Sequence, residues 1–210
     1  MIDEESLNSL RKQIGEILSE RRFEHTLGVE RAARDIAVHC LPSKLTELSA
    51  AALLHDAAKE QSKEEQLRLM IASGIAFTEE DYASESLYHA FCAPELVRTE
   101  FPEFATEDIL SAVFLHTSGG EDMTVFDEII FLADFVEDGR EYDACKELRR
   151  ELFSALESKA DVVEKRKALH YSVLRVIDFT VNYLQKKGRA VNSRMLLARN
   201  SIVDKINSEF

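Results

Sequence analysis

Hydrophobic residues recur three and four positions apart along most of the chain, which is the spacing of amphipathic α-helices. The pattern predicts helices over about residues 7–18, 22–38, 46–58, 82–97, 109–116, 129–136, 143–158 and 161–187, and a short one after Asn192-Ser193. Ser62, Thr78, Thr106 and Thr124 stand where helix N-caps are expected, and Ser62 begins a further helix that Gly74 ends. The alternation of polar and apolar residues that marks a half-buried strand is rare. The chain is therefore predicted to be all-α.

Length and composition are consistent with one folded domain. The 210 residues lie in the range of a single domain, and 45% of them are hydrophobic, which is enough for a substantial core. We expect one domain over residues 1–210. Its catalytic core is expected at about 18–140 and a C-terminal helical part at about 141–210.

The charge balance argues against nucleic acid and anionic membranes as partners, while a small phosphorylated substrate stays possible if metal ions and a few local Lys or Arg residues reverse the field at the site. The chain has 26 Lys and Arg against 39 Asp and Glu, a net charge of −13, and such a surface repels nucleic acid and anionic membranes. No apolar run approaches the roughly 18 residues of a membrane span, and the acidic N-terminus lacks the features of a signal peptide. The cysteines, Cys40, Cys92 and Cys145, are far apart and match no disulfide or metal spacing. They indicate free thiols in a reducing compartment, so we expect the protein in the cytoplasm.

Candidate chemistry is concentrated in histidines and aspartates with apolar neighbours. His55-Asp56 follows the apolar stretch 48–54, and a carboxylate beside an imidazole is costly to bury unless something pairs with it. Asp134 lies inside the apolar run 129–136, where it cannot cap a helix and needs a cation if ionised. Three further histidines stand in similar surroundings: His25, His89 and His116. Imidazoles and carboxylates from several helices are typical ligands of one or two divalent ions, which predicts a metallohydrolase.

Each histidine also has a structural interpretation, because a single His near an apolar face is more often a satisfied core residue than a ligand. We give that role to His39, which ends a helix beside Cys40, and to His170, which has no acidic companion in its helix. Applied to all six histidines, this interpretation would make the chain a helical protein without metal. The order of the other four histidines, with Asp56 and Asp134 among them, favours a metal site instead.

Five segments resemble the successive motifs of a known family. They read RRFEHTLGVE (21–30), AALLHDAAKE (51–60), YHAFCAPELV (88–97), HTSGGEDMT (116–124) and IIFLADFVEDGR (129–140), and the late ARN (198–200) fits as well. Over about residues 18–200 the chain resembles the bacterial HD-domain symmetrical diadenosine tetraphosphatases, called YqeK, of the HD-domain phosphohydrolase superfamily. An HD dipeptide alone is a weak signal, whereas HTSG with MT and ADF-E is specific.

The resemblance implies a bundle of helices around a binuclear metal site, with the C-terminal helices packed on it. One ion is implied on His25, His55, Asp56 and Asp134, and a second on Asp56, His89 and His116. The ions of this family are usually iron. The implied reaction is hydrolysis of diadenosine tetraphosphate at its central bridge, giving two ADP.

Substrate contacts are expected beside these ligands. Lys59 lies one helical turn after His55, so we expect it to contact phosphate next to the catalytic Asp56 and to take part in catalysis. Arg140, which follows a glycine, is expected to fold back and bind a phosphate, and the hydroxyl of Thr117 is expected to donate to a phosphate. Each has an ordinary alternative: a surface lysine, a loop arginine and a residue that ends a helix.

The chain departs from the family in the turn after HTSG, which usually carries Arg-Pro and here carries Gly120-Glu121. A cation near the phosphates is thus replaced by an acid, which bears on substrate preference. Because the metal ligands do not distinguish between nucleotides, deoxynucleotides and guanosine nucleotides stay open as substrates, whereas the lack of a GYP-type motif after the HD segment argues against cyclic dinucleotides. The turn also leaves open a non-catalytic metal-dependent nucleotide-binding protein. Iron, manganese, cobalt and zinc all suit the ligand set. The long C-terminal helix either completes the core or pairs with a second chain in a homodimer.

Overall fold

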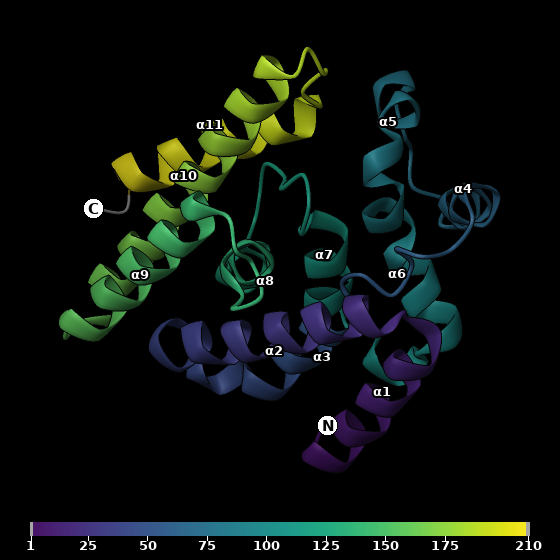
Figure 1. The fold of residues 1–210 in the computed structure, drawn as a ribbon, viewed down its shortest axis with the longest axis horizontal. Helices are drawn as coiled ribbons and strands as arrows, with labels where there is room; N and C mark the ends of the chain where they lie inside the picture. Colours follow the sequence, from purple (N-terminus) through teal and green to yellow (C-terminus); the bar gives the residue numbers. More distant parts are fainter. Residues whose placement is uncertain (1, 209–210) are drawn as a thin grey trace.

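A computed structural model describes residues 2–208, and every regular element within this range is helical (Figure 1). The α-helices are α1 (Glu4–Ile17), α2 (Glu20–Cys40), α3 (Leu45–Leu54), α4 (Lys63–Ala72), α5 (Glu79–Ala83), α6 (Tyr88–Glu100), α7 (Glu107–Leu115), α8 (Val125–Val136), α9 (Asp143–Ser158), α10 (Val162–Lys186) and α11 (Ser193–Ser208). Three short 3-10 helices are η1 (Pro42–Lys44), η2 (Glu85–Leu87) and η3 (Pro102–Phe104). The predicted all-α class is confirmed.

Helix α3 lies at the centre of the bundle. Every residue from Leu48 to Leu54 is buried, and the helix packs against α1, α2, α7 and α8. Its run of alanines lets the surrounding helices approach closely, because a small side chain keeps backbones near one another. The C-terminal ends of α3 and α7 therefore lie close to α2 and α8, and this convergence positions the site described below.

Two helices differ from the sequence prediction. The helix expected over 46–58 ends at Leu54, and residues 55–60 form consecutive turns. The single helix expected over 82–97 is interrupted between α5 and α6. At the interruption, Ser84 Oγ donates to the carbonyl of Glu80 and accepts a hydrogen bond from Asn192 Nδ2 at 3.2 Å. A contact with a distant part of the chain thus holds the bend.

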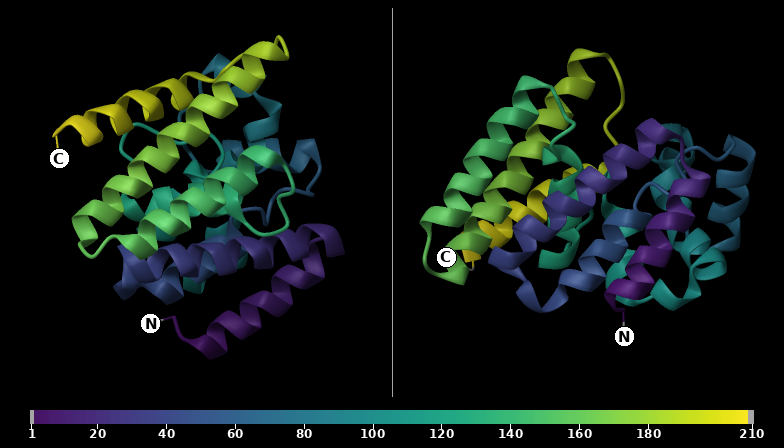
Figure 2. Two further views of the ribbon diagram at one scale, coloured as in Figure 1. Left: turned by 60° about the vertical axis from the view of Figure 1, so that its left-hand side comes forward. Right: turned by 60° about the horizontal axis from the view of Figure 1, so that its bottom comes forward.

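The C-terminal helices pack on the preceding bundle, as predicted. Helices α9 and α10 lie side by side in Figures 1 and 2, and α10 also contacts α2, α8 and α11. Helix α11, expected to be short, has 16 residues. The division into a core at about 18–140 and an appended part at about 141–210 stays a prediction.

A buried charged group joins α8 to α10 and α11. His170 Nδ1 lies 2.6 Å from Glu128 Oε2, and Lys205 Nζ donates to Glu128 Oε1 at 2.9 Å. His170 does have an acidic companion, which the sequence of its own helix could not show, because Glu128 comes from another helix, 42 residues away in sequence. Its position outside the site agrees with the structural role given to it.

The cysteines are free, as expected. Cys40, Cys92 and Cys145 are all buried and unpaired. Burial raises the pKa of Cys40 to about 11 and that of Cys92 to about 12, so both stay protonated near neutrality. Among the described helices, none combines the length and the hydrophobicity that crossing a bilayer requires.

Candidate metal centre

The six candidate ligands converge from five segments. They are His25 on α2, His55 and Asp56 directly after α3, His89 at the start of α6, His116 directly after α7, and Asp134 near the end of α8. Two groups of three offer ligand atoms within 4.8 Å of one another: His25, His55 and Asp134, and His55, Asp56 and His116. The groups share His55. Nε2 of His89, outside both groups, lies 3.4 Å from Asp56 Oδ1.

Asp56 is buried between four imidazoles. Its Oδ1 lies 3.4 Å from His89 Nε2 and 3.6 Å from His116 Nε2. Its Oδ2 lies 3.5 Å from His55 Nε2 and 3.9 Å from His25 Nε2. Each carboxylate oxygen thus faces two imidazoles, so a cation bound here would have Asp56 as a ligand together with His25 and His55 on one side or with His89 and His116 on the other.

His55 and His116 are each oriented by their own backbone. His55 Nδ1 lies 2.6 Å from the carbonyl oxygen of Ala52, and His116 Nδ1 lies 2.7 Å from that of Val113. Because a carbonyl only accepts, each Nδ1 is the protonated nitrogen, and each Nε2 directs a lone pair into the cluster. Within residues 2–208, His55 Nε2 is buried and has no hydrogen-bond partner. A buried lone pair without a donor fits a metal ligand.

His25 is held between two carboxylates. Its Nε2 lies 3.1 Å from Asp134 Oδ1, and its Nδ1 lies 3.1 Å from Glu137 Oε1. Glu137 is buried, and its other oxygen accepts the Gly139 N–H at 2.6 Å. Burial opposes protonation of His25, but the two carboxylates outweigh it and raise its pKa. A cation bound to His25 Nε2 would therefore compete with protonation of this imidazole.

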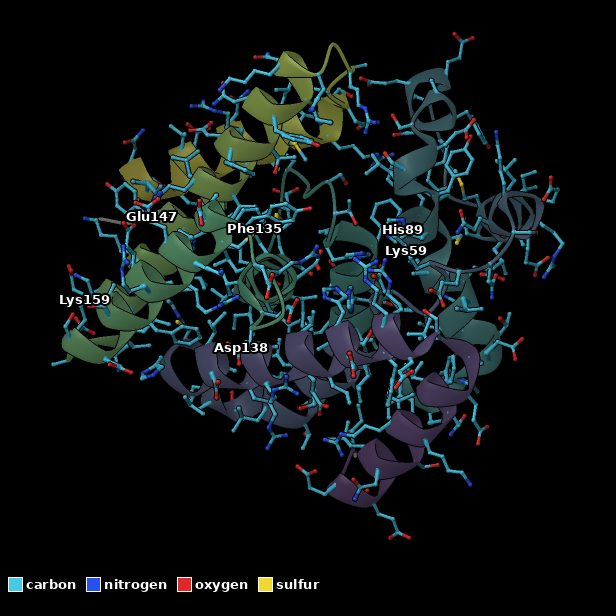
Figure 3. All side chains as sticks on the ribbon, viewed as in Figure 1. Lys59, His89, Phe135, Asp138, Glu147 and Lys159 are labelled. Atoms are coloured by element: carbon cyan, nitrogen blue, oxygen red, sulfur yellow. The ribbon has the colours of Figure 1, made fainter. Side chains whose placement is uncertain are left out.

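Three cations offset the charge of the aspartates. Arg22 Nη1 donates to Asp56 Oδ2 at 2.8 Å, and Arg140 Nη2 donates to Asp134 Oδ1 at 2.5 Å. Lys59 Nζ lies 4.0 Å from Asp56 Oδ1 and 3.0 Å from His89 Nε2. Lys59 and His89 are labelled next to each other in Figure 3. Lys59 Nζ also lies 3.3 Å from His89 Nδ1, so the lysine lies beside both ring nitrogens of His89.

The electrostatics keep the ligands ready for a cation. Burial lowers the pKa of His55 to about 4 and holds that of His89 well below its usual range, so both imidazoles are neutral at pH 7. Burial opposes ionisation of Asp56, but the charged groups around it, Lys59 among them, hold its pKa well below the usual value. The Asp134 pKa is lowered against burial as well, through His25 and Arg140. Neutral imidazoles beside ionised carboxylates are the protonation states that metal binding requires.

Comparison with known proteins agrees with this geometry. Residues 22–138, more than half of the chain, match the HD domain. The chain belongs to the HD-domain family. All six candidate ligands lie within the matched residues, and the resemblance drawn from the motifs is confirmed.

Relatives of this HD-domain hydrolase extend over nearly its whole length. A symmetrical bis(5'-nucleosyl)-tetraphosphatase of Bacillus subtilis (strain 168) is 31% identical over 95% of this chain and 97% of its own length. A protein of the same name from Halalkalibacterium halodurans is 29% identical over 89% of this chain and 91% of its own. The crystal structure of a predicted HD superfamily hydrolase involved in NAD metabolism, from Clostridium acetobutylicum, has a TM-score of 0.79 at 26% identity. It covers 94% of this chain and 97% of that one.

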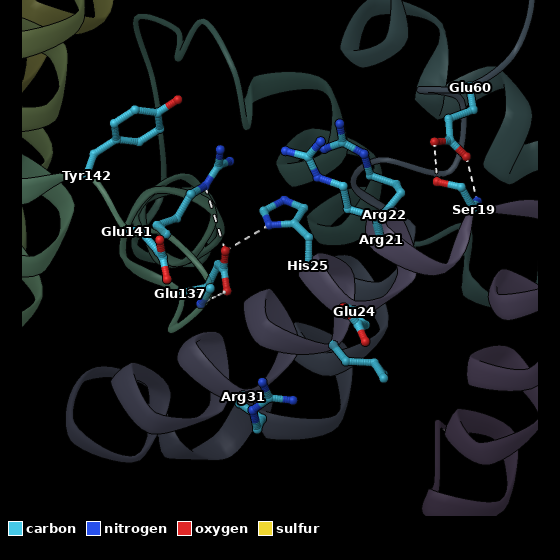
Figure 4. A pocket seen from close by; sticks show the side chains of 13 residues that line it. Ser19, Arg21, Arg22, Glu24, His25, Arg31, Glu60, Glu137, Glu141 and Tyr142 are labelled. Atoms are coloured by element: carbon cyan, nitrogen blue, oxygen red, sulfur yellow. Dashed lines mark hydrogen bonds and ion pairs between the residues drawn. The ribbon is translucent and has the colours of Figure 1, made fainter.

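A cleft opens beside the cluster of the HD domain. Its volume is about 1140 Å³, and its walls come from the start of α2, the turns after α3 and the loop between α8 and α9. Figure 4 shows His25 between two arginines of α2, Arg21 and Arg22, and the loop that carries Glu137 and Tyr142. The cleft therefore reaches the cluster on its His25 side.

The turn after α7 places the remaining expected residue. Thr117 Oγ1 lies 3.2 Å from His89 Nε2, so its hydroxyl faces the cluster. Ser118 Oγ donates to the carbonyl of Gly119, which fits a residue that shapes the turn. A Cβ at Gly120 would lie 2.7 Å from Leu115 Cδ2, and Glu121 is exposed. The described residues give the Glu121 carboxylate no ion pair with the cluster.

Sequence reasoning missed two residues of this site. Arg22 pairs with Asp56, and Glu137 holds His25. A local signal existed for both, because Arg22 precedes His25 by three residues and Glu137 follows Asp134 by three, so each shares a helical face with a candidate ligand. Lys59 and Arg140 were expected, and the structure brings both to the cluster.

Proposed function

We propose that the chain hydrolyses diadenosine tetraphosphate symmetrically, giving two ADP, with two divalent metal ions bound in the cluster. One observation above all supports this. A site of four histidines and two aspartates lies in an HD domain whose relatives, matched over nearly their full length, carry the name symmetrical bis(5'-nucleosyl)-tetraphosphatase. The residues proposed for one ion are His25, His55, Asp56 and Asp134, and for the other Asp56, His89 and His116.

Bound divalent ions supply two things to phosphoryl transfer: an activated water and charge that offsets the phosphate oxygens. We propose iron, while imidazole and carboxylate ligands also suit manganese, cobalt and zinc. The tautomers of His55 and His116 support the proposal, since both present an unprotonated Nε2 to the same carboxylate.

The chain's own cations are proposed to bind the phosphates. Arg22, Lys59 and Arg140 reach the cluster from different segments, and each keeps donors beyond those that its aspartate takes. The hydroxyl of Thr117 adds a neutral donor beside His89. Water attacks a central phosphorus, the bond to the bridging oxygen breaks, and that oxygen leaves with the second ADP. Because a nucleoside diphosphate is a good leaving group, no dedicated general acid is needed.

The test joins metal content to product analysis. The protein is purified anaerobically, its metal per chain is measured, and diadenosine tetraphosphate is incubated with it and its products separated by chromatography. We expect about two metals per chain and ADP as the sole product. Asp56→Ala should lose metal and turnover together, whereas His39→Asn, a histidine outside the cluster, should keep both. Full activity with one ion per chain would contradict the two-metal proposal.

The same assay separates the alternatives. Turnover of deoxynucleotides or other nucleotides in preference to diadenosine tetraphosphate would assign another substrate to the same chemistry. Metal-dependent binding of a nucleotide that is recovered intact would indicate a binding protein without catalysis. The homodimer and the cytoplasmic location stay predictions.

A further inference from the structure

The cleft beside the cluster is larger than the reacting phosphates need. Pockets that enclose whole drug-sized ligands measure roughly 300–1,000 Å³, and this cleft measures about 1140 Å³. A substrate whose phosphates lie at His25 and Arg140 therefore has room for a nucleoside in the same cleft.

Tyr142 is placed as a platform for such a base. Its side chain lines the cleft and is 74% exposed, and within residues 2–208 its hydroxyl has no hydrogen-bond partner. Its backbone is fixed nonetheless, because its carbonyl accepts the N–H groups of Cys145 and Lys146 at 2.9 and 3.1 Å. An aromatic ring that is free on a fixed backbone offers a flat surface for stacking at little loss of conformational entropy.

The loop that carries Tyr142 is tied to the cluster. Arg140, two residues earlier, donates to the side chain and the carbonyl of Asp134. Arg149 donates to the carbonyls of Val136, Glu137 and Arg140, which closes the loop from its other side. The backbone of the loop is thus held to the end of α8 by hydrogen bonds, and Tyr142 lines the same cleft as Arg140.

The opposite wall carries a cation suited to phosphate. Arg21 lines the cleft, is exposed, and has no ion pair among the described residues, while its neighbour Arg22 is engaged with Asp56. In Figure 4 the guanidinium groups of Arg21 and Arg22 lie on one side of His25 and the ring of Tyr142 on the other. Four carboxylates also line the cleft: Glu24, Glu60, Glu137 and Glu141. Glu60 accepts hydrogen bonds from Ser19, and Glu137 is bound to His25 and Gly139. Phosphates are expected beside the arginines, and a base, which is uncharged, tolerates the carboxylates.

We propose that Tyr142 stacks on a purine base of the substrate and that Arg21 binds a phosphate of the same nucleotide. The proposal rests on the function proposed above and deepens it, because it assigns a nucleoside subsite to a cleft that the metal cluster does not occupy. It makes Tyr142 a determinant of nucleotide binding over smaller phosphate compounds.

Calorimetric titration of the metal-loaded protein with ADP and with inorganic pyrophosphate tests the proposal. Loss of base stacking typically weakens binding by about tenfold or more, so Tyr142→Ala should weaken ADP binding about tenfold and leave pyrophosphate binding unchanged. Tyr142→Phe should bind ADP within about twofold of the wild type, because stacking needs the ring and not the hydroxyl. Arg21→Gln should weaken both ligands. The control Tyr171→Ala, an exposed tyrosine of α10 outside the cleft, should weaken neither.

Wild-type affinity of Tyr142→Ala for ADP would overturn the subsite. Equal weakening of ADP and pyrophosphate in Tyr142→Ala would overturn it too, since the loss would then not depend on a base. Failure of the proposed function gives a different result: the wild type binds ADP and leaves diadenosine tetraphosphate intact.

Discussion

Replacing Gly28 by alanine tests how the structure holds His25. Gly28 lies on α2 three residues after His25, and the carboxylate of Glu137 packs directly against it. An added Cβ would lie 3.2 Å from Glu137 Cδ and closer still to Oε2, inside the contact distance of unbonded atoms. Glu137 is only 3% exposed and is bound to His25 and to Gly139, so it has little room to move aside. The substitution must therefore displace this carboxylate.

Three contributions determine the size of the effect. Alanine stabilises a helix interior by up to about 1 kcal/mol relative to glycine. Overpacking a filled site costs about 1–3 kcal/mol, and a lost hydrogen bond to a charged group costs about 1.5–3 kcal/mol. Together these contributions lower the expected free energy of unfolding of Gly28→Ala by about 1.5–5 kcal/mol. Loss of the partner that orients a ligating histidine weakens metal binding by about 10–100-fold, and the same loss is expected here.

The assay separates stability from metal binding. Urea unfolding of the metal-free protein gives the first, and competition with a chelator gives the affinity for divalent metal. Gly15→Ala is the matched control, because its Cβ would meet only the ring of Phe23, at 3.2 Å, outside the cluster. Its metal affinity should equal that of the wild type. If folded Gly28→Ala also bound metal with wild-type affinity, Glu137 would not be what orients His25.

Two further predictions concern a cation of the site and a buried ion pair. Lys59→Ala should raise the KM for the dinucleotide about tenfold, the loss expected for a charged hydrogen bond, with metal per chain unchanged; unaltered kinetics would place Lys59 outside substrate binding. Burial opposes ionisation of Asp81, but Arg194 at 2.9 Å and the Thr78 N–H keep its pKa below the usual value. The ionised carboxylate therefore contributes its full stabilisation above about pH 4. Each pH unit below that lowers its contribution to the free energy of unfolding by up to about 1.4 kcal/mol. The free energy of unfolding of the wild type in urea should exceed that of Asp81→Asn by about 1 kcal/mol less at pH 3 than at pH 7. An equal difference at the two pH values would contradict the role of the charge.

The candidate ligands could be found from the local sequence because each is a polar residue at a position where its neighbours are apolar. His116 falls on the apolar face of its helix, and Asp134 interrupts an apolar run where a cap has no place. Both positions are informative because an apolar environment makes an unpaired polar group costly. The grouping of the residues from five segments is not local, and it came from the order of motifs in the family resemblance.

Residues whose partners lie far along the chain could not be predicted in this way. The break at Ser84 depends on Asn192, and the surroundings of His170 depend on Glu128. In each case the local sequence is compatible with a plain helix, and a side chain from another helix decides the outcome. Tertiary contacts override local propensity wherever they satisfy a polar group that the local structure leaves open.

The early end of α3 links the fold to the site more closely than sequence pattern could show. Ala57 and Ala58 favour continuation of the helix. In the structure, however, His55 Nδ1 donates to the carbonyl of Ala52. This carbonyl is the one that would accept the N–H of Asp56 in a continuing helix. His116 Nδ1 likewise donates to the carbonyl of Val113 where α7 ends. In each case one hydrogen bond at the residue where the helix ends selects the tautomer that points Nε2 into the cluster. The ends of α3 and α7 and the orientation of two candidate ligands are therefore linked through the same bonds, a link that the local sequence pattern does not show.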